Sequence, residues 1–216
     1  MAREDMRMRW LEVRRHAYTK KGTARGTGSH LSQQGVDLAR RVGPQIGAMQ
    51  WVVTSTTPRT AETALAMGFA VDVLAEMGGQ AWGRAQAELG HHAHWAWADP
   101  FGQYQALIGQ GSAIAELARR QAELWTAAAG HVPDGGKALV VSHGGLIEPG
   151  LVACLPAADR EPWGGPFAHC EGITLAFDGT RFTSVTVRRQ QANTATTPCK
   201  PQTPHITGNQ QRCRDY

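Results

Sequence analysis

The sequence has few cysteines and no long hydrophobic run. Its four cysteines, Cys154, Cys170, Cys199 and Cys213, form no Cys-x-x-Cys pair, so neither a zinc knuckle nor a disulfide framework is predicted. No apolar stretch approaches the length of a membrane-spanning helix. The N-terminus is charged through Arg9 and is not followed by the apolar core of a signal peptide. We therefore expect a soluble, cytoplasmic protein with no membrane partner.

The sequence also lacks an extreme of charge. Its 216 residues are 42% hydrophobic and 19% charged, with a formal net charge of +4. This length and composition fit one globular domain with a substantial core. Basic residues are dispersed, and the densest run, 3–15, also contains Glu4, Asp5 and Glu12. The mild excess fits an anionic small molecule, and we expect no nucleic-acid partner.

Short apolar runs alternate with helical patterns along most of the chain. The pattern predicts strands at 10–13, 51–55, 69–74 and 138–142, and helices at 32–47 and 58–67. Residues 173–177 and 182–187 flank Asp178-Gly179, a turn signal, and so predict a C-terminal hairpin. The alternation predicts an α/β fold, a three-layer sandwich with a mostly parallel central sheet.

Two segments depart from this alternation. The Ala-rich stretch of about 80–130, with four of the tryptophans, predicts a helical insertion over the site, broken near Asp99-Pro100. From residue 190 the chain is polar and punctuated by prolines. We therefore predict a folded domain over residues 1–189 and a disordered tail over 190–216.

Polar residues follow three of the predicted strands. Arg15-His16 ends the first, Ser55 with Arg59 follows the second, and Ser142-His143 ends the fourth. The carboxyl ends of parallel strands meet at one edge of a sheet, so these side chains should converge. Two guanidinium groups match phosphate oxygens, a neutral imidazole can attack phosphorus, and a second, protonated imidazole can hold the developing charge. The convergence predicts a phosphate site that needs neither a metal nor a cofactor.

These motifs resemble those of the histidine phosphatase superfamily, also called the phosphoglycerate mutase-like family. Residues 15–17 (Arg-His-Ala) resemble its Arg-His-Gly motif, and 31–35 (Leu-Ser-Gln-Gln-Gly) resemble its Leu-Thr-x-x-Gly helix start. Residues 55–64 resemble Ser-x-x-x-Arg-Ala-x-Gln-Thr-Ala, and 140–145 (Val-Val-Ser-His-Gly-Gly) match the motif of the second histidine. Residues 170–179 resemble the family's last strand pair, so the resemblance covers roughly 10–188.

The resemblance implies a role for each matching residue. His16 would be the nucleophile that takes the phosphoryl group. Arg15, Arg59 and His143 would bind the phosphate, with His143 also part of the catalytic set. The family's proton donor is an acid between the second arginine and the insertion, a place that Glu76 occupies. From position alone, Glu88 or Asp99 are alternatives to Glu76.

Two residues depart from the family pattern. Ala17 stands where the family has glycine, and its methyl group fits only if the backbone φ there is negative. Tyr18 replaces the usual acidic residue or glutamine. Either change bears on whether the chain is active.

The resemblance implies a histidine acid phosphatase-like hydrolase of phosphoric monoesters, acting on a phosphorylated small molecule. One alternative is a cofactor-dependent mutase, but residues 17–20 (Ala-Tyr-Thr-Lys) do not resemble the extended mutase motif Arg-His-Gly-Glu-Ser-x-x-Asn. A second alternative is a non-catalytic phosphate-binding relative. The sequence leaves the substrate and the oligomeric state open.

Three histidines in the predicted insertion, His91, His92 and His94, suggest a metal site at first sight. No cysteine or carboxylate nearby completes a ligand set, so a solvated helix face is the favoured interpretation.

Overall fold

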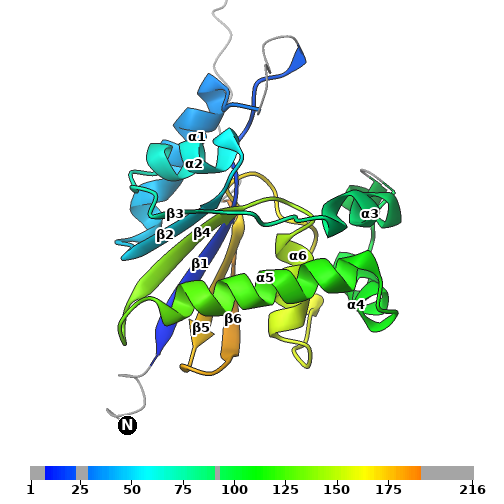
Figure 1. Cartoon of the computed structure of the whole chain (residues 1–216). Coiled ribbons are helices and arrows are strands. Elements are labelled where there is room, and N and C mark those ends of the chain that lie inside the picture. The colour runs from blue at the N-terminus through cyan, green and yellow to red at the C-terminus, as the bar shows by residue number, and fades with distance from the viewer. Residues whose placement is uncertain (1–7, 23–28, 91–92, 191–216) are drawn as a thin grey trace, which may run out of the picture.

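The computed structural model describes residues 8–22, 29–90 and 93–190, and at its centre lies a six-stranded sheet (Figure 1). The strand order is β3-β2-β4-β1-β5-β6. The strands are β1 (Arg9–Arg15), β2 (Trp51–Ser55), β3 (Val73–Ala75), β4 (Lys137–Ser142), β5 (Gly172–Phe177) and β6 (Phe182–Arg188). The pairs β2·β3, β2·β4 and β1·β4 are parallel, whereas β5 and β6 join as antiparallel strands. The predicted α/β fold with a mostly parallel sheet is confirmed.

Helices cover both faces of this sheet (Figure 1). Helices α1 (Gln33–Ile46) and α2 (Pro58–Ala66) pack on one face, and α5 (Ala113–Gly130) and α6 (Ile147–Cys154) pack on the other. Alternate residues of β4 explain the two cores: Ala138 and Val140 pack with Trp125 of α5, while Leu139 and Val141 pack on the α1 side. Because both faces are buried, this central strand is continuously apolar.

The third strand is shorter and begins later than predicted. The sequence pattern favoured 69–74, but β3 spans Val73–Ala75. The backbone N–H of Phe69 closes the end of α2 by donating to the carbonyl of Ala64 at 3.0 Å. Phe69 packs against the core under α1 and α2, so its hydrophobicity serves helix packing rather than a strand.

Several helices lie between β3 and β4: α3 (Ala81–Glu88), the 3-10 helix η3 (Ala93–Ala96) and α4 (Pro100–Gly109) precede α5. The Asp99 carboxylate accepts the backbone N–H of Gly102 at 2.9 Å and caps α4. The predicted break at Asp99-Pro100 is thus the start of a helix. The boundaries of about 80–130 for a functional insertion stay a prediction.

The C-terminal hairpin of β5 and β6 turns at the predicted place. The Asp178 carboxylate accepts backbone N–H groups of Thr180 and Arg181 at 2.8 and 2.9 Å, which fixes the turn. A short 3-10 helix, η4 (Glu161–Trp163), precedes the loop that leads into β5. Of the predicted tail, residues 191–216 lie outside the described residues. Within the described ranges, no helix is long and apolar enough to cross a membrane.

Candidate active site

Strand register places the predicted site residues at one edge of the sheet. Arg15 at the end of β1 lies opposite Ser142 at the end of β4, and the backbone N–H of His16 donates to the Ser142 carbonyl at 2.9 Å. Ser55 is the last residue of β2, which pairs with β4 on its other side. His143 directly follows β4, so its ring lies next to His16, with ring centroids 5.3 Å apart.

His16 has a fixed tautomer. Its Nδ1 lies 2.8 Å from the carbonyl oxygen of Ala17, and since a carbonyl only accepts, Nδ1 carries the proton. The lone pair is therefore on Nε2, the atom available for attack. Burial, followed by His143 and the charges of Arg59 and Arg15, lowers the pKa of His16 to about 2, against the hydrogen bond to Ala17. The imidazole is neutral at pH 7.

His143 is also neutral. Its Nδ1 accepts hydrogen bonds from Arg59, whose Nη2 is 3.1 Å and Nε 3.3 Å away, while its Nε2–H donates to Ser55 Oγ at 2.9 Å. Burial, followed by the charges of Arg59 and Arg15, lowers the pKa of His143 to about 3. The sequence-based expectation of a protonated second imidazole is not met, because Arg59 occupies the Nδ1 lone pair.

Arg59 lies in the first turn of α2, which directs it toward the strand ends. Glu62, three residues further along the same helix, could instead hold this side chain in a surface ion pair. In the structure Glu62 instead pairs with His30 and accepts the backbone N–H of Leu31 at 2.7 Å. Arg59 bonds to His143, as the predicted convergence requires.

Arg15 is the second arginine near the two histidines. Its Nη1 donates to the carbonyl of Phe167 at 2.7 Å, and its guanidinium carbon lies 4.3 Å from the centre of the Trp95 ring. Burial lowers its pKa, and the nearby carboxylates of Glu148 and Glu171 oppose this effect. Arginine nevertheless keeps its charge, so Arg15 adds a second fixed cation to the site.

Glu76 shares a cavity of about 130 Å³ with Arg59 and His143. Its Oε1 accepts the backbone N–H groups of Gly78 and Gly79 at 3.2 and 3.1 Å, which holds the exposed carboxylate in place. Arg120 of α5 fixes the same turn by donating to the Glu76 carbonyl at 2.8 Å. Gly79 has φ +58°, a conformation that favours glycine.

The two alternative acids have structural partners elsewhere. Glu88 accepts the backbone N–H groups of Ala113 and Ile114 at the start of α5, at 2.9 and 3.1 Å. Asp99 caps α4. Neither lines the cavity of Arg59 and His143, whereas Glu76 does.

Comparison with known proteins agrees with this arrangement. A family model described as the histidine phosphatase superfamily (branch 1) matches residues 12–190. The chain belongs to the histidine phosphatase superfamily. The resemblance inferred from the motifs is thereby confirmed. A search of curated proteins found no match.

Solved structures of two phosphatases and a phosphoglycerate mutase share the fold. A mycobacterial glucosyl-3-phosphoglycerate phosphatase is 21% identical, with a TM-score of 0.57 over 85% of this chain and 100% of its own. The phosphoserine phosphatase of Entamoeba histolytica is 18% identical, with a TM-score of 0.57 over 84% and 98%. A phosphoglycerate mutase from Bacillus anthracis str. Sterne is 17% identical, with a TM-score of 0.51 over 87% and 94%. At these identities the likeness shows the fold.

Ala17, which follows His16, fits its position without backbone strain. Ala17 is fully buried, and its backbone N–H donates to Thr63 Oγ1 at 3.0 Å. The described non-glycine residues with positive φ are Ser29 and Cys170, so Ala17 has the backbone conformation that an alanine tolerates. Its methyl group packs into the core with Val141.

Two rings beside the superfamily site were not among the predicted site residues. Trp95 of η3 stacks on Arg15, and its ring also lies so close to Gly144 that a Cβ there would come within 2.1 Å of it. The His169 ring centroid is 5.5 Å from that of His16 and 4.4 Å from that of Tyr18. His169 precedes the matched Cys170 motif directly, and this adjacency was the one sequence signal for it.

Glu148 was also missed. Its side chain is fully buried, and its two oxygens accept the backbone N–H groups of Gly145 at 2.7 Å and Phe167 at 3.0 Å. Burial raises its pKa, against these hydrogen bonds and the charge of Arg15. A single acid in an otherwise apolar helix was the available signal, because a buried carboxylate needs partners.

Of the three histidines in the predicted insertion, the structure describes His94, and its surroundings differ from the prediction. His94 is 4% exposed, so it does not belong to a solvated helix face. Its ring packs against Trp95 and Trp97, with centroids 4.3 and 6.1 Å away. His91 and His92 lie outside the described residues. Among the described residues, no three His, Cys, Asp or Glu side chains are grouped to hold a metal ion.

The two neutral histidines predict a loss of stability in acid. In the folded protein their pKa values are about 2 and about 3, against 6.5 for an ordinary histidine. At pH values between the folded-state pKa values and 6.5, these histidines are protonated in the unfolded chain but not in the folded protein. The stabilisation is complete above pH 6.5 and is lost as pH falls toward the folded values. The free energy of unfolding, measured in urea, falls between pH 7.5 and pH 4.5. This fall should be about 2 kcal/mol smaller in the His143→Gln variant than in the wild type. An equal loss in both proteins would contradict this.

Proposed function

We propose that this protein is a metal-independent phosphatase that hydrolyses phosphomonoesters through a phosphohistidine intermediate on His16. The observation that carries the proposal is the tautomer of His16, which leaves the Nε2 lone pair beside His143 and within the field of two arginines. The two phosphatases with similar folds support the same reaction class. The substrate proposed is a phosphorylated small molecule.

In the first step, the lone pair of His16 Nε2 attacks phosphorus and the bond to the ester oxygen breaks. The ring gains positive charge, which the carbonyl of Ala17 stabilises through its hydrogen bond to Nδ1–H. Arg15 and Arg59 neutralise the phosphoryl oxygens, and His143 donates its Nε2–H to one of them in place of Ser55. Glu76, as the carboxylic acid, gives its proton to the leaving oxygen.

In the second step, water attacks the phosphohistidine. Glu76, now a carboxylate, takes a proton from that water, and the new P–O bond forms as the P–N bond breaks. The electron pair of the P–N bond returns to Nε2 of His16. Inorganic phosphate leaves, and both residues regain their starting protonation states.

A mutase is the second candidate, since a phosphoglycerate mutase shares the fold. It would pass the phosphoryl group to a substrate hydroxyl instead of water. The segment after His16, Ala17–Lys20, lacks the extended mutase motif, which favours the phosphatase. A non-catalytic phosphate-binding relative is the third candidate, and the unstrained Ala17 backbone favours an open site over a blocked one.

Labelled substrates separate these functions. We expect the protein to release ³²P as inorganic phosphate from sugar phosphates or phosphoglycerates, with the rate unchanged in EDTA. Samples quenched in alkaline detergent should carry a base-stable, acid-labile label on His16. Label that moves to another carbon of the sugar acid would identify a mutase. Phosphate binding without release from any ester would identify the non-catalytic relative.

A further inference from the structure

The loop that runs from the last residue of η4 to β5, residues 163–171, reaches the candidate active site at two points. The carbonyl of Phe167 accepts the Nη1–H of Arg15 at 2.7 Å, and the ring of His169 lies beside that of His16. Backbone hydrogen bonds tie the loop's end to β1, since Cys170 N–H donates to the Arg15 carbonyl at 3.0 Å. The loop therefore supplies a hydrogen bond that orients the Arg15 guanidinium.

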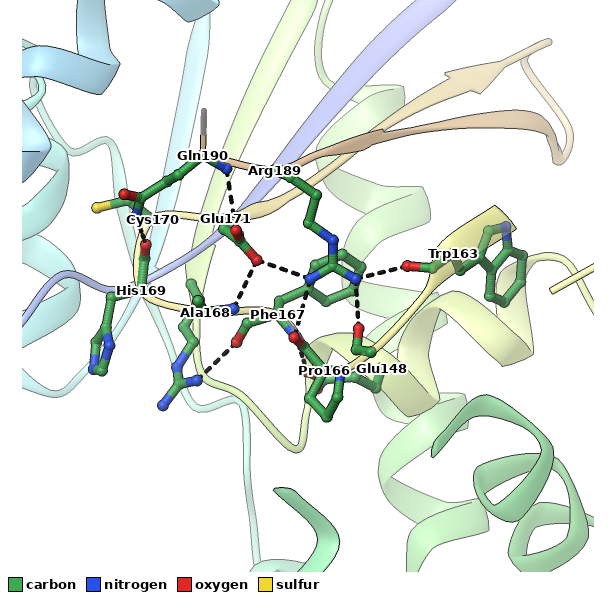
Figure 2. A network of polar contacts seen from close by, with 12 residues as sticks. Glu148, Trp163, Pro166, Phe167, Ala168, His169, Cys170, Glu171, Arg189 and Gln190 are labelled. Atoms are coloured by element: carbon green, nitrogen blue, oxygen red, sulfur yellow. Dashed lines mark hydrogen bonds and ion pairs between the residues drawn. The ribbon is translucent and has the colours of Figure 1, made fainter. Parts of the chain in front are cut away.

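One side chain from outside the loop, that of Arg189, binds several of its backbone carbonyls. Arg189, directly after β6, reaches back across the Phe167 ring, with its guanidinium carbon 4.5 Å from the ring centre (Figure 2). Its Nη1 donates to the carbonyl of Pro166 at 3.0 Å, and its Nη2 donates to the carbonyls of Trp163, at 2.6 Å, and Gly165. Three backbone carbonyls of the loop thus accept hydrogen bonds from one planar guanidinium group.

Glu171 completes the arrangement. Its carboxylate accepts from Arg189 at 2.8 Å and from the backbone N–H groups of Ala168 and Gln190 at 2.9 and 3.1 Å (Figure 2). Burial alone would raise the pKa of Glu171, but the hydrogen bonds from Arg189 and the two backbone groups hold it below its ordinary value. The pair stays charged at pH 7, and the exposed fractions of the two side chains are 32% and 12%.

From the other side the loop is held by Glu148, which accepts the backbone N–H of Phe167. Glu148 also accepts the N–H of Gly145, so it fixes the loop relative to the turn after His143. Arg189 and Glu148 thus bind opposite sides of the segment around Phe167. This leaves the Phe167 carbonyl directed at Arg15.

We propose that Arg189 is a positioning residue, which orients Arg15 for phosphate binding through the loop 163–171. The inference rests on the proposed function of the same site. Arg189 itself does not contact substrate in this scheme. It holds the Phe167 carbonyl, which holds the Arg15 guanidinium in the rotamer that meets the phosphate, so that less conformational entropy is lost on binding.

The test compares Arg189→Ala with Arg188→Ala in the full chain. Arg188 is the adjacent residue, and its Nε donates to Thr174 Oγ1 at 2.8 Å, away from the loop. Both variants remove one positive charge, so a difference between them reports the loop contacts and not long-range electrostatics. The dissociation constant of inorganic phosphate is measured by calorimetry, and kcat and KM are measured with p-nitrophenyl phosphate.

Arg189→Ala should weaken phosphate binding about tenfold and raise KM by a similar factor, while kcat falls less. Arg188→Ala should change neither constant by more than about twofold. Thermal unfolding followed by circular dichroism shows whether each variant folds. If Arg189→Ala does not fold, Arg189→Lys, which keeps the charge but not the fork, should give an intermediate loss of phosphate affinity.

A double-mutant cycle with Arg15→Lys identifies the route. If Arg189 acts through Arg15, adding Arg189→Ala to Arg15→Lys should cost little further affinity. Additive losses, or equal effects of Arg189→Ala and Arg188→Ala, would overturn the proposal.

The binding measurement does not depend on turnover. If the wild type binds phosphate without hydrolysing any ester, the proposed function fails and the comparison of Arg189 with Arg188 still decides the inference. If the wild type binds no phosphate, both fail.

Discussion

Replacing His16 with alanine is expected to lower kcat/KM for p-nitrophenyl phosphate by at least about 10³-fold. The nucleophile would be absent, while the phosphate pocket, with the cations Arg15 and Arg59 and the neutral His143, would persist. Phosphate affinity should therefore change far less than turnover. The measurement is the initial rate of nitrophenol release, alongside calorimetric titration with inorganic phosphate.

The matched control is His131→Ala. This imidazole stacks on Trp51, with ring centroids 3.9 Å apart, at the opposite end of β2 from Ser55. Its removal should leave turnover unchanged. If His16→Ala and the wild type hydrolyse the ester at the same rate, His16 is not the nucleophile and the proposed mechanism is wrong.

Replacing Glu76 with glutamine should have the next largest effect, and the effect should depend on the leaving group. A sugar alkoxide needs a proton as its bond to phosphorus breaks, whereas p-nitrophenolate leaves readily without one. We expect kcat to fall by about 10²-fold or more for a sugar phosphate and by less than about tenfold for p-nitrophenyl phosphate. Steady-state rates on the two esters give this ratio.

The acids Glu88 and Asp99 serve as comparison variants, because they were alternatives on sequence alone. Glu88→Gln and Asp99→Asn keep a side-chain oxygen for the same backbone N–H groups, so they should change the melting temperature little and show no dependence on the leaving group. A leaving-group dependence in either of them, and not in Glu76→Gln, would reassign the proton donor.

Sequence patterns were sufficient for the central strands of the sheet, because these strands are surrounded by other strands and covered by helices. β4 is apolar at every described core position from Ala138 to Val141, since it is buried on both faces, and it was predicted within one residue. The site positions followed from the same logic, because polar residues at the ends of parallel strands have to meet. β3 was misplaced because Phe69 packs under helices, and a hydrophobic residue in a short segment does not reveal its partner.

The sequence by itself determined the fold class, the superfamily and which residues stand at the strand ends, since these depend on local pattern and order along the chain. Only the tertiary structure decided the protonation of the two imidazoles, the choice of Glu76 as the acid in the cavity, and the contacts of Arg15 with Phe167 and Trp95. Each depends on distances between segments far apart in sequence, and no periodicity encodes such distances.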